Sequence, residues 1–210
     1  MTNDYIVSQC LKDRLPIAPY QILDTDLDVI SYPFLLSSKL PGELGCFAYE
    51  KSDHAGRLAI ARGLGQTLAA IHSLETDGAG LKNLDTRHFM KMIEDLLCAP
   101  DIRSSIEGMR PGFHERLKEL SVVLDRAAHE DPPTLIWRDP FFYNMLVDVS
   151  GDTPEITGVY DFQSAAYGSR QLDLERVRRG FDFQATRPRA KTSEAYADPA
   201  AIEEVWRGYE

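Results

Sequence analysis

The chain has 210 residues, of which 43% are hydrophobic and 27% are charged, and its formal net charge is −10 at pH 7. This composition is typical of a soluble globular protein with one domain or two small ones, and it excludes a fibrous or disordered chain. No apolar run approaches the roughly 20 residues of a membrane span, and the first residues, "MTNDYIVSQC", lack a secretory signal. We therefore expect a cytoplasmic protein without a membrane partner. An acidic chain repels phosphate backbones, so we expect no nucleic-acid partner.

Cysteine and histidine positions give no sign of a metal or disulfide framework. Cys10, Cys46 and Cys98 are far apart, odd in number and without C-x-x-C spacing, which is typical of reduced thiols. The five histidines are dispersed, and no pair of His and Cys has the spacing of zinc ligands.

The first part of the chain predicts one short helix and then short strands. Residues 5–15 are compatible with a helix. Residues 15–25, "LPIAPYQILDT", contain two prolines and an alternating apolar run, which predicts a loop and a strand. In residues 32–43, "YPFLLSSKLPGE", we expect "FLL" to be a short buried strand that "LPGE" ends with a turn.

The middle of the chain changes to a helical period. From Gly56 onward, apolar residues recur every three or four positions, which predicts a helix with one buried face: Leu58, Ala61, Leu64, Leu68 and Ile71. Residues 89–97 and 113–127 predict two further amphipathic helices.

The last part predicts a hairpin between helical segments. "TLIW" precedes "NMLVDV" and "EITGVYDF", and the polar stretch "SGDTP" between the latter two predicts a β-hairpin. We expect a helix near residues 171–179, a loop over 187–198, and a final helix with Asp198 as its N-cap. Strands, helices, a hairpin and helices in this order indicate an α+β fold.

Three polar side chains stand at the open end of this hairpin. A hairpin brings its two ends together, so Asn144 and Asp161 should be neighbours, with Asp139 in the loop nearby. Two hard oxygen ligands suit Mg²⁺ and substrate phosphates. A third carboxylate, not bound to metal, can accept a proton from a hydroxyl group. An alternative remains open, in which Asp139 and Asn144 are loop residues that bond their own backbone.

Two separated motifs resemble a known family. Asp139-x4-Asn144 is followed by Met-Leu-Val, and "DFQSAAYGSRQLDL" begins at Asp161 and contains Asp173. They are similar to the loops H-G-D-x4-N and D-[FW]-E-x-A-x-x-G-x4-D-L of the aminoglycoside phosphotransferase and choline kinase branch, the phosphotransferase enzyme family. The resemblance implies a protein-kinase-like α+β fold. Its reduced N-terminal β lobe and hinge would span residues 1–40, and its helical C-terminal lobe, with a catalytic β-hairpin, residues 41–210.

The same resemblance implies a phosphotransferase that uses Mg²⁺ and ATP or GTP. Its acceptor would be a hydroxyl group of a small molecule, such as an aminoglycoside or macrolide, while sugars, amino alcohols and homoserine stay open. The residues implied are a catalytic base, Asp139; metal ligands, Asn144 and Asp161; nucleotide contacts, Ser38, Leu40, Leu146 and Tyr160; and a support residue, Asp173.

This sequence also departs from the family pattern. Trp137 replaces His and Arg138 replaces Gly before the first aspartate, and Gln163 replaces an acid in the second motif. A Gly-rich phosphate loop and a lysine-bearing strand are missing before residue 16, so the chain resembles a kinase core clipped at both ends. Gly63-Leu64-Gly65 lies in a predicted helix, where we expect it to serve packing.

Two residues outside these motifs also have counterparts in the family. Asp4 stands near the position of the family's helix glutamate, without the lysine that would pair with it. We expect His72 to be structural. The alternative function is a pseudokinase-like binding or regulatory protein without efficient phosphotransfer. A metal-dependent phosphohydrolase is a weaker third hypothesis, because dense His and Asp clustering is missing.

Overall fold

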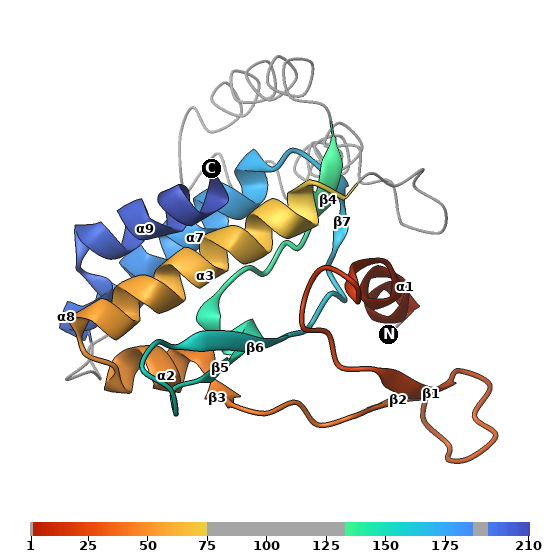
Figure 1. Ribbon diagram of the computed structural model, residues 1–210. Helices are drawn as coiled ribbons and strands as arrows, with labels where there is room; N and C mark the ends of the chain where they lie inside the picture. Colours follow the sequence, from red (N-terminus) through yellow and green to blue (C-terminus); the bar gives the residue numbers. More distant parts are fainter. Residues whose placement is uncertain (1, 75–132, 187–192) are drawn as a thin grey trace, which may run out of the picture.

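The computed structural model describes residues 2–74, 133–186 and 193–210, which form helices and three small antiparallel sheets (Figure 1). The elements in chain order are α1 (Thr2–Leu11), β1 (Tyr20–Asp24), β2 (Phe34–Ser37), β3 (Glu43–Leu44), α2 (Gly45–Lys51), α3 (His54–His72), β4 (Thr134–Ile136), the 3-10 turn η1 (Phe142–Asn144), β5 (Met145–Asp148), β6 (Glu155–Val159), β7 (Ala166–Gly168), α7 (Gln171–Ala185), α8 (Ser193–Tyr196) and α9 (Pro199–Tyr209).

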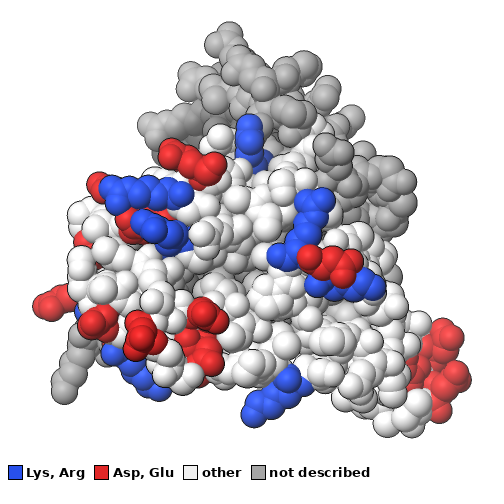
Figure 2. All heavy atoms as spheres, in the orientation of Figure 1, with Lys and Arg blue, Asp and Glu red and all other residues white. Residues whose placement is uncertain are grey.

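The sheets separate into an outlying pair of strands and two sheets against the helices. Strands β1 and β2 pair with each other, β3, β5 and β6 form a second sheet, and β4 pairs with β7. The β1–β2 hairpin projects from the body near α1 (Figure 1). Acidic side chains gather at its tip, where Asp26 and Asp28 are exposed (Figure 2). Elsewhere on this face, lysines and arginines of the described residues are interspersed with acids.

Helices α3 and α9 pack side by side through glycines (Figure 1). A Cβ atom added to Gly65 would overlap the carbonyl oxygen of Val205, and Gly208 makes the reciprocal approach to α3. A Cβ atom at Gly63 would lie 2.8 Å from the side chain of Ile156 on β6. The G-L-G stretch therefore serves close packing in the middle of α3, as its sequence context predicts.

An aromatic cluster lies beneath η1 and explains the apolar residues around it. Tyr49 of α2 stacks on Phe142 at 4.6 Å and on Tyr196 at 4.9 Å between ring centroids. Phe141 meets Phe181 of α7 edge-on at 5.6 Å. All five side chains are buried. Because these rings bury large apolar areas, they anchor the short turn that carries the polar residues of the loop.

Several predicted elements are confirmed. The β5–β6 hairpin pairs Met145 with Val159, and the predicted middle helix is α3, whose N-cap Asp53 accepts a hydrogen bond from the Gly56 amide at 2.8 Å. Helix α9 starts at Pro199, and Asp198 caps it as expected. Helix α7 covers the predicted residues 171–179 and continues to residue 185.

Other predictions are wrong in detail. Helix α1 starts and ends earlier than residues 5–15, because residues 12–14 form a turn closed by the Leu15 amide on the Leu11 carbonyl. The "FLL" strand is β2, but it is half exposed rather than buried, since it pairs only with β1; Leu36 is 45% exposed. The expected loop 187–198 contains α8. Elements α2, β3 and β7 were not predicted, and the helical runs 89–97 and 113–127 lie outside the described residues.

Candidate active site

The open end of the β5–β6 hairpin places Asn144 beside Asp161. Strand β5 begins directly after Asn144, and β6 ends two residues before Asp161. The first pair of the ladder is Met145 with Val159, and the Tyr160 amide donates to the Asn144 carbonyl at 3.2 Å. The proximity predicted from the sequence therefore follows from the register of the two strands.

Asp139 is fastened to Asn144 across the η1 turn. The side-chain nitrogen Nδ2 of Asn144 donates to the backbone carbonyl of Asp139 at 3.0 Å and to its carboxylate Oδ2 at 3.2 Å. Asn144 is 5% exposed, whereas the Asp139 side chain is 30% exposed. The structure thus brings together all three polar residues that the sequence singled out, and the Asp139 carboxylate remains accessible to a solute.

Trp137, which stands where the family usually has His, links the two loops through a polar contact. Its indole Nε1 donates to the Asp161 carbonyl at 3.0 Å, and the side chain is fully buried. Asp161 has φ 61°, in the left-handed region that non-glycine residues rarely adopt. The Trp137 bond helps to hold this conformation, so the tryptophan contributes a polar contact as well as apolar packing.

Asp173 of α7 holds the backbone just before Asp139. Its fully buried carboxylate accepts from the amides of Trp137 at 2.7 Å and Arg138 at 2.8 Å, and His72 Nε2 lies 3.1 Å from it. Arg138 has φ 70°, a conformation that costs little for glycine and more for other residues. This backbone geometry gives a physical reason for the family's usual Gly at this position.

His72 has a structural environment, in agreement with the expectation from its place at a helix end. Its Nδ1 lies 2.8 Å from the Tyr209 hydroxyl, while its Nε2 faces Asp173. The His72 side chain is only 4% exposed. The imidazole therefore joins the C-terminal ends of α3 and α9 to the first turn of α7.

Asp4 of α1 reaches the segment that follows Asp161. Its Oδ1 accepts from the Phe162 amide at 2.7 Å, and the residue is 8% exposed. Burial raises the pKa of Asp4, and the negative charge of Asp161 nearby acts in the same direction. Asp4 thus tethers α1 to the second loop through a backbone contact that needs no lysine.

Two donors on the Asp139 carboxylate were not expected from the sequence. The Tyr143 hydroxyl donates to Oδ1 at 2.9 Å, and Arg176 Nη2 lies 3.4 Å from the same atom. Burial and the hydrogen bond to Asp139 raise the pKa of Tyr143 to about 12. In the sequence, only spacing could have indicated the Arg176 contact. Arg176 follows Asp173 by three residues, so the two share one face of the helix.

Of the four residues predicted to contact the nucleotide, the structure brings Leu40 and Leu146 together but leaves Ser38 apart. A Cβ atom added to Gly158 would lie 3.0 Å from both Leu40 Cδ1 and Leu146 Cδ1, so these two leucines meet over the glycine. The Tyr160 hydroxyl donates a hydrogen bond to the Tyr143 carbonyl at 2.7 Å. Ser38 belongs to the β1–β2 region instead, where its amide donates to the Pro19 carbonyl and its hydroxyl accepts from Gln21.

The donor set fits magnesium better than a transition metal. Across residues 2–74, 133–186 and 193–210, no group of three or more His, Cys, Asp or Glu side chains could hold a metal ion. Mg²⁺ needs only one or two protein oxygens when phosphates and waters complete its shell. The Asn144 amide nitrogen is committed to Asp139, so its Oδ1 is the atom that can serve as a ligand beside the Asp161 carboxylate.

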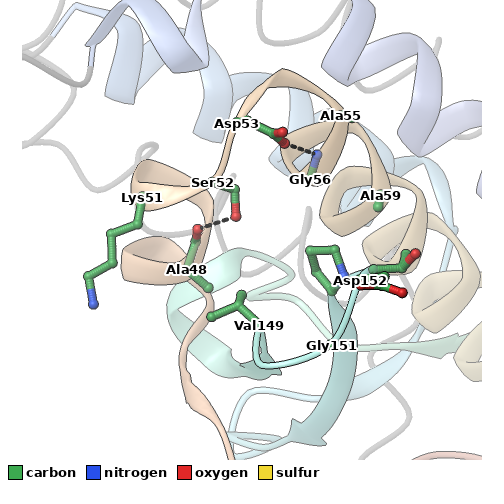
Figure 3. A pocket seen from close by; sticks show the side chains of 12 residues that line it. Ala48, Lys51, Ser52, Asp53, Ala55, Gly56, Ala59, Val149, Gly151 and Asp152 are labelled. Atoms are coloured by element: carbon green, nitrogen blue, oxygen red, sulfur yellow. Dashed lines mark hydrogen bonds between the residues drawn. The ribbon is translucent and has the colours of Figure 1, made fainter.

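A separate cavity of 380 Å³ lies at the turn end of the same hairpin (Figure 3). Its wall comes from the end of α2, the start of α3 and the β5–β6 turn, and includes Lys51, Asp53 and Asp152. Asp139, Asn144 and Asp161 do not line it. This cavity is therefore distinct from the site at the open end.

Among the described helices, none is long and apolar enough to cross a membrane.

Comparison with known families shows which family the chain belongs to. The model of the phosphotransferase enzyme family matches residues 6–209. The chain belongs to this family. A comparison with proteins of curated function gives no match.

Solved structures of several phosphotransferases share the fold of this chain. The GDP and kanamycin complex of APH(2")-IIia is 15% identical to this chain and has a TM-score of 0.66. The match covers 99% of this chain and 67% of that protein. Macrolide 2'-phosphotransferase MphH from Brachybacterium faecium is 19% identical with a TM-score of 0.56, covering 97% and 61%. An ethanolamine kinase from Plasmodium vivax is 14% identical with a TM-score of 0.55, covering 99% and 60%. The predicted α+β, kinase-like fold is thereby confirmed, and the chain spans about two thirds of these proteins' lengths or less.

Proposed function

We propose that this phosphotransferase-family protein transfers the γ-phosphoryl group of ATP or GTP to a hydroxyl group of a small molecule. The arrangement of Asp139, Asn144 and Asp161 at one hairpin end carries the proposal. Phosphoryl transfer requires positioning and charge neutralisation and little covalent help from the protein. The partly exposed Asp139 carboxylate would position the acceptor, and a cation held by the two neighbouring oxygen ligands would neutralise charge.

Each of the three residues has a separate role in this reaction. Asp139 accepts a hydrogen bond from the acceptor hydroxyl and takes its proton as the hydroxyl attacks. Asn144 Oδ1 and the Asp161 carboxylate would hold Mg²⁺, which when bound neutralises charge on the nucleotide phosphates. Asp173 keeps the backbone before Asp139 in place through its two amide bonds.

The nucleotide would occupy the side of the hairpin that faces the small N-terminal portion. Leu40 and Leu146, which meet over Gly158, supply an apolar surface for the base, with Tyr160 next to the metal ligand Asp161. The Ser38 amide is already bonded to Pro19, so its carbonyl is the group that can accept from a base amino group. Solved structures similar to this chain include complexes named for GDP, ADP and ATP, which favours a nucleotide donor.

The acceptor proposed is a small molecule with an alcohol group. Aminoglycosides and macrolides are named for several of the similar structures, and ethanolamine for another. The division into a small lobe and hinge at residues 1–40 and a large lobe at 41–210 is part of the same proposal. It agrees with the separation of the β1–β2 sheet from the others.

One observation favours a second candidate. The described lysines include Lys12, which bonds Gln9, and Lys51, which bonds Glu43; in the part of the chain that the structure describes, no lysine contacts Asp4 or Asp161. A protein that keeps the fold but lacks such a cation would handle phosphate poorly. The alternative is therefore a binding or regulatory protein without efficient phosphotransfer.

Calorimetric titration with Mg·ATP and Mg·GTP separates the candidates at their first step. We expect binding that requires Mg²⁺, followed by phosphorylation of at least one alcohol from a panel of kanamycin, erythromycin and ethanolamine. Failure to bind either nucleotide at millimolar concentration refutes the enzyme proposal for this chain. Binding without transfer to any alcohol or to water favours the regulatory alternative.

Variants then test the individual roles. Asp139→Ala should abolish transfer and leave nucleotide affinity nearly intact, whereas Asp161→Ala should weaken the Mg²⁺-dependent part of binding. Asp152→Ala is the matched control, because this exposed aspartate lies at the opposite end of the hairpin. Transfer by Asp139→Ala at the wild-type rate would remove the general-base assignment.

A further inference from the structure

Helix α7 contacts the catalytic loop at two successive positions on one face. Asp173 bonds the backbone amides of Trp137 and Arg138, and Arg176, three residues later, reaches the Asp139 side chain. Residues three apart on a helix are surface neighbours. The same helix therefore holds both the backbone before Asp139 and the carboxylate of Asp139 itself.

The two oxygens of Asp139 are used unequally. Oδ1 accepts from the Tyr143 hydroxyl at 2.9 Å and faces Arg176 Nη2 at 3.4 Å, while Oδ2 accepts only from Asn144 Nδ2 among the described residues, at 3.2 Å. An ionised carboxylate offers about four lone-pair positions. Oδ1 is thus fully occupied, and the remaining position belongs to Oδ2.

We infer that Arg176 is a positioning residue that, together with Tyr143, occupies Oδ1 of Asp139 and presents Oδ2 to the acceptor hydroxyl. This inference rests on the proposed function and deepens it by naming the proton-accepting atom. In the transfer, the acceptor oxygen forms a bond to the γ-phosphorus as the bond from that phosphorus to the bridging oxygen breaks. The hydroxyl proton moves to Oδ2, and ADP or GDP leaves.

Arg176 holds Asp139 in orientation rather than stabilising the fold. Its side chain is 60% exposed, and exposed ion pairs contribute little to folding. Its distance of 3.4 Å exceeds the usual length of a charge-assisted hydrogen bond, so the contact is a weak one. Loss of Arg176 would therefore leave Oδ1 with Tyr143 alone and loosen the orientation of the carboxylate, while leaving the protein folded.

A matched control lies on the same helix. Arg179 is 75% exposed and pairs with Glu175 at 2.8 Å. Hydrogen bonds from Arg178 and then Arg179 lower the pKa of Glu175 to about 2, so this pair is ionised at neutral pH. Arg179→Gln removes the same charge from α7 without touching Asp139.

The first test needs no turnover. The side-chain amide resonances of Asn144 and the backbone amide of Asp139 are followed by nitrogen-15 NMR in wild type, Arg176→Gln, Arg176→Lys and Arg179→Gln. We expect shifts in Arg176→Gln, smaller ones in Arg176→Lys, and none in Arg179→Gln. Identical resonances in Arg176→Gln and wild type would overturn the contact and the inference with it.

The second test measures transfer, with water as the acceptor in the absence of an alcohol and with any alcohol that the panel identifies. We expect Arg176→Gln to lower kcat about 10-fold, in line with the sensitivity of transfer to small misplacements, with KM for Mg·ATP within about twofold of wild type. Arg176→Lys should recover part of the loss. Equal kcat in Arg176→Gln and wild type would refute the positioning role, while absence of turnover in wild type refutes the proposed function and leaves the NMR result to decide on the contact.

Discussion

Replacement of Asp173 is the most informative perturbation of this fold. The carboxylate is completely buried and accepts from two backbone amides, at 2.7 and 2.8 Å, and from His72. Asp173→Ala leaves the amides of Trp137 and Arg138 without their acceptor in a buried place. Each unsatisfied donor costs about 1–3 kcal/mol, so for the two amides we expect the free energy of unfolding to fall by about 2–6 kcal/mol.

Asp173→Asn also removes the carboxylate but keeps the size of the side chain. One carbonyl oxygen remains to accept, so one of the two amides keeps its bond, and the expected loss is about 1–3 kcal/mol. Released from Asp173, Arg138 can also leave its positive φ, which would move Asp139 and lower kcat in any active preparation. Both variants are therefore expected to affect the loop as well as the stability.

The assay is urea unfolding followed by circular dichroism and by tryptophan fluorescence, since Trp137 lies next to the lost contact. Asp182→Asn is the matched control, because Asp182 is on the same helix, is 60% exposed and pairs only with Arg178 among the described residues. It should change the free energy of unfolding by less than about 0.5 kcal/mol. Asp173→Ala and Asp173→Asn within that same margin of wild type would refute the bracing argument.

Four further predictions address other contacts. Gly65→Ala should lower the unfolding midpoint in urea by the equivalent of about 1–3 kcal/mol, because a methyl group would collide with the α9 backbone; an unchanged midpoint would contradict the close packing. Trp137→Phe should cost about 1–2 kcal/mol in the same assay, because the Asp161 carbonyl loses its donor. Asp198→Ala should reduce helicity and cost about 1 kcal/mol through loss of the α9 cap, with wild-type helicity as the opposing result. The raised pKa of Asp4 means that the folded protein binds this proton more readily than the unfolded chain, so the wild type should gain stability relative to Asp4→Asn as the pH falls from neutrality toward 3.8. A pH-independent difference between these two proteins would show that folding does not raise the pKa of Asp4.

The sequence predicted the parts of the fold that depend on local order. Periodicity found α3, the turn chemistry found the β5–β6 hairpin, and the Asp-Pro pair found the start of α9. It failed at the short elements α2, β3 and β7, whose few residues carry too little pattern. It also misjudged the burial of β2, since burial depends on what a strand packs against and not on its own composition.

The sequence by itself determined which polar residues meet at the open end of the hairpin. Asn144 and Asp161 stand at the two ends of a hairpin, so their proximity followed from the register of the strands. Asp139 lies only five residues before Asn144, in the loop that leads into the hairpin. Only the tertiary structure decided how Asp139 is held. Arg176 contacts Asp139 from helix α7, and Trp137 donates to the Asp161 carbonyl through its indole N–H. Both contacts join segments that are distant in the chain. Such contacts depend on how helices and loops pack in three dimensions, and no local pattern encodes them.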